Sequence, residues 1–310
     1  TSPSTSQADH TCRPTKTTHT EPNMSLDKQP LSIPRQSLVT ERASTDSSGV
    51  RSTDGRTVDQ TRMVQMRVGV LAKAAGSACV EFQNTRVLCS IAGPTQTEGK
   101  EYLSRANLEC SLRFTSFAQR SRRRGVLGSA ADERALSSAL RTALVASVQL
   151  DQYPKSVIAV NVLVIQDDGG ALAAALMCAS LALAHAGLLM YDLVAASSCA
   201  ILDGSIVLDP SASELRVSTG QVTIGHMCSL QQVTLLHVDA AIPFERMTEV
   251  LQLVLEGCAK LHTRMRAILT DSSTVERNSD ASASQQMALD EQVPAEKRQR
   301  GVSKATDVHV

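Results

Sequence analysis

The sequence predicts a domain in which strands and helices share one core, and two stretches carry this prediction. In the first stretch, a Val- and Ile-rich run (156–165) precedes an Asp-Asp-Gly-Gly turn (167–170) and an uncharged run of Ala and Leu (171–186). The first run suits a buried strand and the second a buried helix. In the second stretch, residues 244–269, apolar side chains recur at helical spacing.

Low-complexity segments flank the expected domain. Residues 1–60 are rich in Ser, Thr and Pro, and burial of so few apolar side chains does not offset the entropy lost on ordering, so we predict a disordered leader. The absence of Met at position 1 suggests a fragment or an over-extended translation, with Met24 as a start. Residues 272–310 are polar and predict a disordered tail. The folded domain is therefore expected at residues 61–271.

Short strands open this domain. The strings RMVQMRVGVL (62–71), ACVEF (78–82) and RVLCSIAGP (86–94) are separated by turn residues, which predicts a three-stranded meander. Residues 105–114 then alternate between apolar and polar side chains, the period of a half-buried antiparallel strand.

A loop with four arginines and a helix follow. The loop, FAQRSRRRG, carries Arg120, Arg122, Arg123 and Arg124. The helix is expected to begin at Ser129, with acidic residues in its first turn, and its apolar positions recur at helical spacing. These residues are Asp132 and Glu133 for the first turn and Leu136, Leu140, Leu144 and Val148 for the apolar face.

Two strand pairs and a long helix complete the prediction. Asp203-Gly204 is typical of a hairpin turn. Pro243 is suited to open a helix, because its missing N–H costs nothing there. The strands are expected at 193–202, 205–208, 214–225 and 227–238, and the helix from Phe244 to about Leu269.

A membrane-spanning helix is the alternative for residues 169–190, which lack charged side chains. This segment is rich in Ala and Gly rather than Leu and Phe, contains His185, and has no flanking basic and aromatic anchors. We therefore predict a helix inside the domain and no membrane contact.

Composition excludes several functions. The 31 basic and 31 acidic residues balance, so any attraction for a polyanion must come from a local patch. The absence of Trp and the scarcity of other aromatic residues argue against a base-stacking platform. The eight cysteines form no C-x-x-C pair, which favours reduced core thiols in a cytosolic or nuclear protein over structural zinc. His226, Cys228 and His237 are expected to be core or surface residues, and no metal or cofactor is predicted.

Five strings stand in a characteristic order along the expected domain. They are DGR (54–56), VGVLAKAAGSACVEFQNTRVLCSIAGP (68–94), YPKSVIAV (153–160), ASLALAHAGLLMYDLVAA (179–196) and IVLDP (206–210). Together they resemble the RNase PH family of phosphorolytic exoribonucleases, and in particular the non-catalytic ring subunits of the exosome. This resemblance implies an RNase PH-like, two-layer α+β domain, related to domain 2 of ribosomal protein S5, in which a mixed sheet packs with helices. It also implies a six-membered ring of such domains.

The resemblance identifies a degenerate site. Phosphorolysis requires a helix N-terminus and a guanidinium to hold phosphate against the RNA backbone. Active members carry a Gly, a hydroxyl residue and an Arg where this chain has Gly170, Ala171 and Leu172. Of the family's acidic pair, Asp209 matches the first member, whereas the second falls on Leu215, next to Glu214. The resemblance therefore implies a non-catalytic subunit, with an active phosphate-dependent 3′-to-5′ exoribonuclease that uses Asp209 and Glu214 as the alternative.

The arginines of the loop have two interpretations. A run of charges is commonly a solvated loop, but the family's equivalent loop faces the central channel of the ring. The resemblance thus favours Arg120, Arg122, Arg123 and Arg124 as contacts to the backbone of single-stranded RNA.

Partners and location follow from the resemblance alone. It implies other RNase PH-like exosome subunits and cap subunits, a role in RNA processing and degradation, including rRNA maturation and mRNA turnover, and a location in nucleus, nucleolus and cytoplasm. A homo-oligomeric RNA-binding protein outside the exosome is a further alternative.

Overall fold

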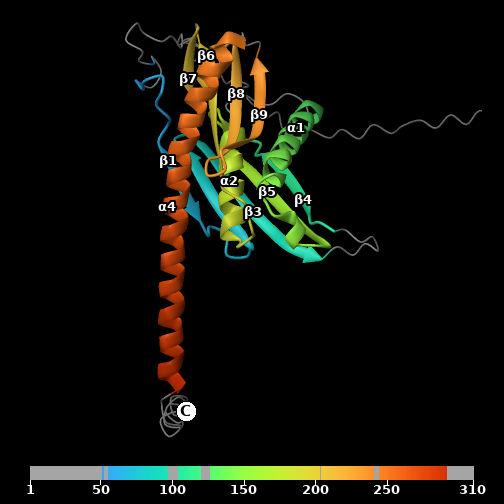
Figure 1. Ribbon diagram of the computed structural model, residues 1–310, viewed down its shortest axis with the longest axis vertical. Coiled ribbons are helices and arrows are strands. Elements are labelled where there is room, and N and C mark those ends of the chain that lie inside the picture. Colours follow the sequence, from blue (N-terminus) through green and yellow to red (C-terminus); the bar gives the residue numbers. More distant parts are fainter. Residues whose placement is uncertain are drawn as a thin grey trace, which may run out of the picture. The chain divides into compact units, whose positions relative to one another are not determined.

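The computed structural model describes residues 51, 55–96, 104–119, 126–202, 204–240 and 244–291, without the side chains of 126–130, 240, 244 and 272–291. These residues form two sheets with helices packed against them (Figure 1), so the expected α+β class is confirmed.

The first sheet has five strands in the order β1-β2-β3-β5-β4. The predicted meander is present, because β1–β2 and β2–β3 pair antiparallel. Strand β5 carries the expected buried Val and Ile residues and pairs with β3 and β4. The strands are β1 (Val64–Val68), β2 (Gly76–Phe82), β3 (Thr85–Gln96), β4 (Asn107–Phe114) and β5 (Ser156–Gln166).

Strand β4 pairs with β5 in parallel, so the expected antiparallel pairing is wrong. Helix α1 (Val126–Val145) connects the two strands, followed by the short 3-10 helix η1 (Leu150–Gln152). A strand–helix–strand crossover within one sheet makes its strands parallel. Helix α1 also begins before Ser129, which leaves Asp132 and Glu133 outside its first turn.

Side chains of α1 close the outer edge of β4. The backbone N–H of Leu112 donates to Ser137 Oγ at 2.9 Å, and that of Phe114 donates to Glu133 Oε1 at 3.3 Å. Arg141 Nε donates to the carbonyl oxygen of Leu108 at 2.9 Å. Backbone groups that an edge strand would otherwise leave open are thus satisfied within the domain.

Helix α2 (Ala171–His185) is buried against both sheets, as its composition predicts. The second sheet has the order β7-β6-β8-β9 and is antiparallel throughout. Its strands are β6 (Val194–Leu202), β7 (Ser205–Leu208), β8 (Gly220–Met227) and β9 (Gln232–Ala240). Residues of α2, both sheets and the last helix share one hydrophobic core.

The strand expected from Glu214 is wrong over its first residues, because helix α3 occupies Ala212–Val217. Ser211 Oγ accepts from the N–H of Glu214, and the carboxylate of Glu214 accepts from the N–H of Ser211 at 2.8 Å. This capping box matches the sequence signature S-x-x-E at 211–214, which stabilises a helix start.

The last helix, α4 (Phe244–Glu291), is longer than expected. An end near Leu269 and a disordered tail from residue 272 are therefore wrong as far as Glu291. No Gly or Pro occurs between Gly257 and Pro294, so nothing in the sequence stops the helix. Helix α4 packs on β6 and β8 through Val250, Val254 and Cys258.

The fold also begins earlier than expected. Arg51 is only 2% exposed, and residues 55–60 belong to the described structure, so the leader prediction is wrong for these residues. The backbone N–H of Leu208 donates to the carbonyl oxygen of Val58 at 2.9 Å, which places this segment beside β7.

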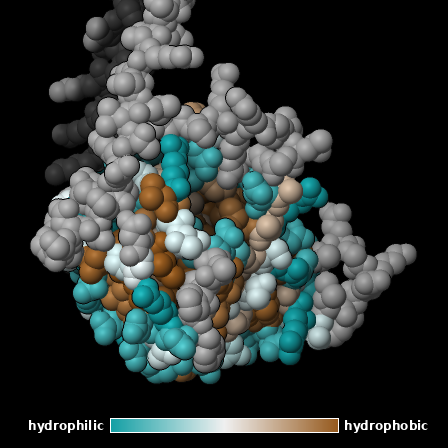
Figure 2. Space-filling view, turned by 90° about the horizontal axis from the view of Figure 1, so that it is seen from above, coloured by the Kyte–Doolittle hydropathy of each residue, from teal (hydrophilic) through white to brown (hydrophobic). Residues whose placement is uncertain are grey.

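The surface of the described residues mixes both kinds of side chain. In Figure 2, hydrophobic residues lie among hydrophilic ones on the face seen from above. None of the helices in the described ranges combines the length and the apolar character that crossing a membrane requires.

Candidate functional site

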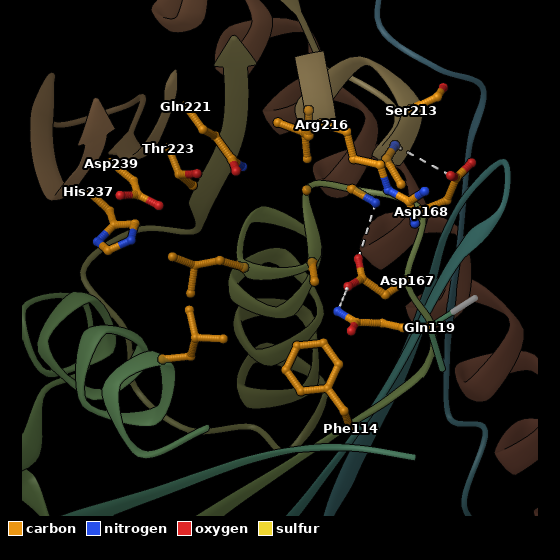
Figure 3. A pocket seen from close by; sticks show the side chains of 17 residues that line it. Phe114, Gln119, Asp167, Asp168, Ser213, Arg216, Gln221, Thr223, His237 and Asp239 are labelled. Carbon is orange, nitrogen blue, oxygen red and sulfur yellow. Dashed lines mark hydrogen bonds between the residues drawn. The ribbon is translucent and has the colours of Figure 1, made fainter. Parts of the chain in front are cut away.

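A pocket of about 520 Å³ lies at the N-terminus of α2. One wall comes from the end of β4 and the turn before α2, with Phe114, Gln119 and Asp167. The opposite wall comes from β8 and β9, with Thr223 and His237 (Figure 3). The pocket therefore lies between the two sheets, where several loops converge.

The Gly-Gly turn shapes the head of the pocket. Gly169 and Gly170 have φ of 91° and 68°, a region that other residues rarely adopt. A side chain on Gly169 would also lie 2.6 Å from the carbonyl oxygen of Pro210. Both positions therefore require glycine, which explains the dipeptide that the sequence places between strand and helix.

The N-terminus of α2 carries neither a hydroxyl nor a cation at its first two positions. Ala171 and Leu172 both line the pocket, and Gly170 supplies no side-chain cap. Leu172 is 6% exposed and belongs to the hydrophobic core. The structure thus brings together the predicted degenerate residues Gly170, Ala171 and Leu172, but with no guanidinium among them to neutralise phosphate.

Two carboxylates lie beside this helix N-terminus instead. Asp167 accepts hydrogen bonds from Gln119 Nε2 at 2.8 Å and from the N–H of Gly169 at 3.1 Å. Asp168 accepts from Asn84 Nδ2 at 3.0 Å and from the N–H of Ala212 at 3.4 Å. With Asp239 on the opposite wall, the described lining residues carry three carboxylates and the guanidinium of Arg216. These residues present net negative charge to an anion.

Asp209 does not line this pocket, because it is buried in an ion pair with Arg62. Arg62 Nη2 lies 2.6 Å from Asp209 Oδ1, and Arg62 Nε lies 3.0 Å from Oδ2. The backbone N–H of Arg62 donates to Oδ2 at 2.9 Å. Both residues are at most 5% exposed. The same guanidinium donates to the carbonyl oxygens of Asp168 and Gly169, at 2.9 and 3.0 Å.

Glu214 is likewise absent from the pocket lining and is 1% exposed. Its carboxylate completes the capping box of α3 and lies 3.6 Å from Arg51 Nη1. Leu215, which the resemblance places at the second acidic position, does line the pocket. The two candidate acidic residues are therefore structural partners of arginines. Asp209 lies behind Gly170, at the N-terminus of α2, but neither carboxylate lines the pocket.

Arg51 and Arg62 are the site residues that the sequence did not identify. They precede Asp209 by 158 and 147 residues. Arg51 donates to its carbonyl oxygen and Arg62 to its carboxylate. No periodicity or spacing links positions so far apart. Arg120, Arg122, Arg123 and Arg124 lie outside the described residues.

His226 and Cys228 lie next to each other, and His237 lies apart from them. His226 Nδ1 lies 3.4 Å from Cys228 Sγ, whereas His237 faces the pocket. Burial lowers the pKa of His226. Burial also raises the pKa of Cys110, Cys199 and Cys258 to about 12, which keeps these thiols protonated. Within the described ranges, no three His, Cys, Asp or Glu side chains are arranged to hold a metal ion.

Two family models match the chain: "3′ exoribonuclease family, domain 1" over residues 60–188 and "domain 2" over residues 192–257. The exosome complex component MTR3 of Mus musculus is 38% identical over 230 residues, which cover 68% of this chain and 84% of that protein. The exosome complex component RRP41-like of Arabidopsis thaliana is 33% identical over 222 residues, 71% of this chain and 85% of that protein.

Solved structures share the fold. Rice Rrp46 has a TM-score of 0.60 and 23% identity, over 70% of this chain and 99% of its own. A chain of the Archaeoglobus fulgidus exosome, solved with RNA bound to the active site, also has a TM-score of 0.60, with 22% identity over 70% of this chain and 93% of its own.

Proposed function

The chain belongs to the 3′ exoribonuclease family of RNase PH, and we propose that it acts as a non-catalytic subunit of an exosome ring. The matches to relatives named as exosome components span 85% and 84% of those proteins, which supports a ring-forming domain. Its partners would be other RNase PH-like subunits, cap subunits and single-stranded RNA.

The observation that carries the non-catalytic assignment is the burial of both candidate acidic residues. Asp209 is held by Arg62, and Glu214 caps α3 and faces Arg51. A carboxylate in such a pair cannot bind a metal ion or move a proton at a pocket it does not line. At the pocket itself, Asp167 and Asp168 oppose an incoming phosphate, and Leu172 supplies no compensating charge.

The alternative, an active phosphate-dependent exoribonuclease, requires Asp209 and Glu214 to reach the pocket. That would break the buried ion pair of Arg62 and the capping box of Ser211, and nothing at the start of α2 would compensate for their loss. We therefore favour the non-catalytic function.

Release of nucleoside diphosphate tests this function directly. The purified full chain is incubated with single-stranded RNA and inorganic phosphate, with RNase PH as a positive control. We expect no release above background, and none from the variant Ala171→Ser/Leu172→Arg, because Asp209 stays bound to Arg62 in it. Phosphate-dependent release by the unmodified chain would contradict the proposal.

The proposed RNA contact resides in the arginine loop, residues 120–124. Guanidiniums bind phosphates without reading sequence and release counterions, so binding weakens as salt rises. Replacing all four arginines with Gln in the assembled ring should flatten the dependence of RNA affinity on salt by up to about three units of slope, at roughly 0.7 per contact. An unchanged slope would exclude this loop as an RNA contact.

Subunit composition tests the proposed assembly. Native mass spectrometry of the tagged chain from its own cells should show a hetero-oligomeric ring with one copy of this chain. A homo-oligomer would favour the alternative of an RNA-binding protein outside the exosome. Fluorescence microscopy of the same tagged chain should place it in nucleus, nucleolus and cytoplasm.

A further inference from the structure

Strand β9 is an edge of the second sheet that differs from the other edges. The outer edge of β4 is closed by side chains of α1, and β7 is contacted by the segment that contains Val58. Across the described ranges, no strand pairs with β9 on its far side, and of the helices α1 packs near it. An open edge is a template for another strand.

A row of large apolar side chains accompanies this edge. Val233, Leu236 and Val238 are 50%, 51% and 37% exposed. Leu236 lies opposite Ile224, and Val238 lies opposite Val222. A register shift between Gly225 and His226 places Val233 opposite His226, on the same face as these two. We refer to Val233, Leu236 and Val238 as the β9 stripe.

The β9 stripe continues the core face of the sheet. Val222 and Ile224 are at most 1% exposed, and cross-strand partners share a face. Their neighbours Gln221 and Thr223 line the pocket, so the stripe lies on the opposite face, where α4 packs on β6 and β8. Helix α4 covers these strands and leaves β9 exposed.

The other face of β9 is polar and lies at the pocket. His237 and Asp239 form part of the wall opposite Asp167 (Figure 3). Among the described residues that line this pocket, three carboxylates stand against one arginine, so these residues favour a positively charged side chain over an anion. The two faces of β9 therefore favour different residues in a bound segment: apolar residues against the β9 stripe and basic residues against the polar face.

We propose that β9 binds an extended segment of a partner protein in which apolar and basic residues alternate. Successive side chains of a strand point to opposite faces, so such a segment covers the β9 stripe with one set and faces Asp239 and the pocket with the other. The proposal does not depend on the partner being a ring subunit.

Strand addition suits these features better than a helix or a nucleic acid. An extended segment can form main-chain hydrogen bonds with the unpaired edge of β9, which a helix cannot do because its own backbone groups are already paired. The carboxylates on the other face repel a phosphate backbone.

Fluorescent peptides provide the test. A peptide of alternating Val and Lys, as long as the 9 residues of β9, is titrated into the full chain and followed by fluorescence anisotropy. We expect it to bind at least about tenfold more tightly than a Val and Glu peptide of the same length, because each Glu meets carboxylates. Hydrogen exchange should show new protection of the amides of β9 and none at β4, whose edge is already closed.

Variants locate the site. Leu236→Lys and Val233→Lys should each weaken binding of the Val and Lys peptide about tenfold, because they place a charge in the stripe. Val217→Lys on α3 is the matched control, since Val217 is also 50% exposed, and it should leave binding unchanged. Asp239→Asn should weaken the Val and Lys peptide but not a Val and Gln peptide. If Leu236→Lys does not fold, Val233→Lys at the more peripheral position carries the test.

Three results would overturn the proposal. The first is equal binding of the Lys and Glu peptides, or binding without new protection in β9. The second is self-association of the full chain that Val233→Lys abolishes, which would make a second copy the occupant. The third is displacement of the peptide by a short single-stranded RNA that itself protects β9, which would make the edge a nucleic-acid site.

Discussion

The carboxylates of Asp167 and Asp168 and that of Asp209 lie around the same Gly-Gly turn, yet their surroundings differ. Asp209 is buried and held by a guanidinium through two hydrogen bonds. Asp167 and Asp168 face a pocket, and the hydrogen bonds that their carboxylates accept within the described residues come from neutral donors. The charge of Asp209 is thus neutralised inside the fold, whereas the charges of Asp167 and Asp168 give the pocket a negative electrostatic potential.

This difference separates stability from chemistry. A buried charge with its partner fixes the structure, and removal of the partner leaves an uncompensated charge in a medium of low dielectric. A charge at a pocket contributes little to stability but decides which ions approach. The following predictions test this division, from the largest expected effect to the smallest.

Arg62→Ala should lower the free energy of unfolding by about 3–5 kcal/mol, because Asp209 would remain buried without its partner. Urea denaturation followed by circular dichroism measures this loss. Arg67→Ala, an exposed arginine on neighbouring β1, is the control and should change stability by about 0.5 kcal/mol or less. Adding Asp209→Asn to Arg62→Ala should recover part of the loss. Equal effects of Arg62→Ala and Arg67→Ala would contradict the division.

Asp192 extends the comparison to a carboxylate far from the pocket. Burial acts to raise its pKa, but hydrogen bonds from Ser229 and Leu193 and the nearby His262 outweigh it, and the pKa is lowered from 3.8. A lowered pKa adds stability that is complete above about pH 4 and is lost as pH falls through the folded-state value. Asp192→Asn should therefore cost about 1–2 kcal/mol at pH 7, since hydrogen bonds to a charged group are lost.

The pH dependence is the measurement that decides this prediction. The gap in unfolding free energy between the unmodified chain and Asp192→Asn should shrink steadily between pH 5 and pH 2. A gap that stays constant over this range would show that the charge of Asp192 does not contribute.

The capping box of α3 is, like the ion pair of Asp209, a buried interaction, and its loss should have a smaller effect on stability. Ser211→Ala should cost about 1 kcal/mol, because one backbone N–H at the start of α3 loses its acceptor. Thr219→Ala, at an exposed position after the helix, should cost less. Thermal unfolding compares them, and a larger loss for Thr219→Ala would argue against the cap.

The smallest expected effect concerns the carboxylates that face the pocket. Asp167→Asn should raise the affinity of the full chain for inorganic phosphate about fivefold, because it removes one repelling charge beside the start of α2. Its unfolding free energy should change little. Asp151→Asn, at an exposed position outside the pocket, should leave phosphate affinity unchanged in the same calorimetric titration. A large loss of stability in Asp167→Asn would show that this carboxylate, like that of Asp209, stabilises the fold.

Local patterns predicted the elements but not their pairing. The apolar runs at β5 and α2 and the turn residues at 203–204 identified strand, helix and hairpin. The parallel pairing of β4 depends on how α1 crosses the sheet, which alternation cannot show. Helix α3 was predictable, since S-x-x-E at 211–214 is a capping signature, but the apolar residues after it suggested a strand.

The candidate site was predictable only in part. The resemblance identified Gly170, Ala171 and Leu172, and the structure places them together at the pocket. It also placed Asp209 and Glu214 in the same site, but neither lines the pocket: Asp209 lies behind Gly170 in an ion pair with Arg62, and Glu214 caps α3. The ion pairs with Arg62 and Arg51 join distant parts of the chain, and only the folded topology reveals them.

The contacts of Arg51 and Arg62 with residues 208–214 affect the order in which parts of the domain fold during translation. Arg62 leaves the ribosome 147 residues before the carboxylate that binds it, a delay of about 7 to 30 s at ordinary rates of translation. During this interval the first sheet can form, but the segment before it, which contains Arg51 and Arg62, lacks its partners at residues 208–214. The beginning of the domain is therefore among the last parts to be fixed, and a nascent chain that stops before β7 keeps it exposed to proteases.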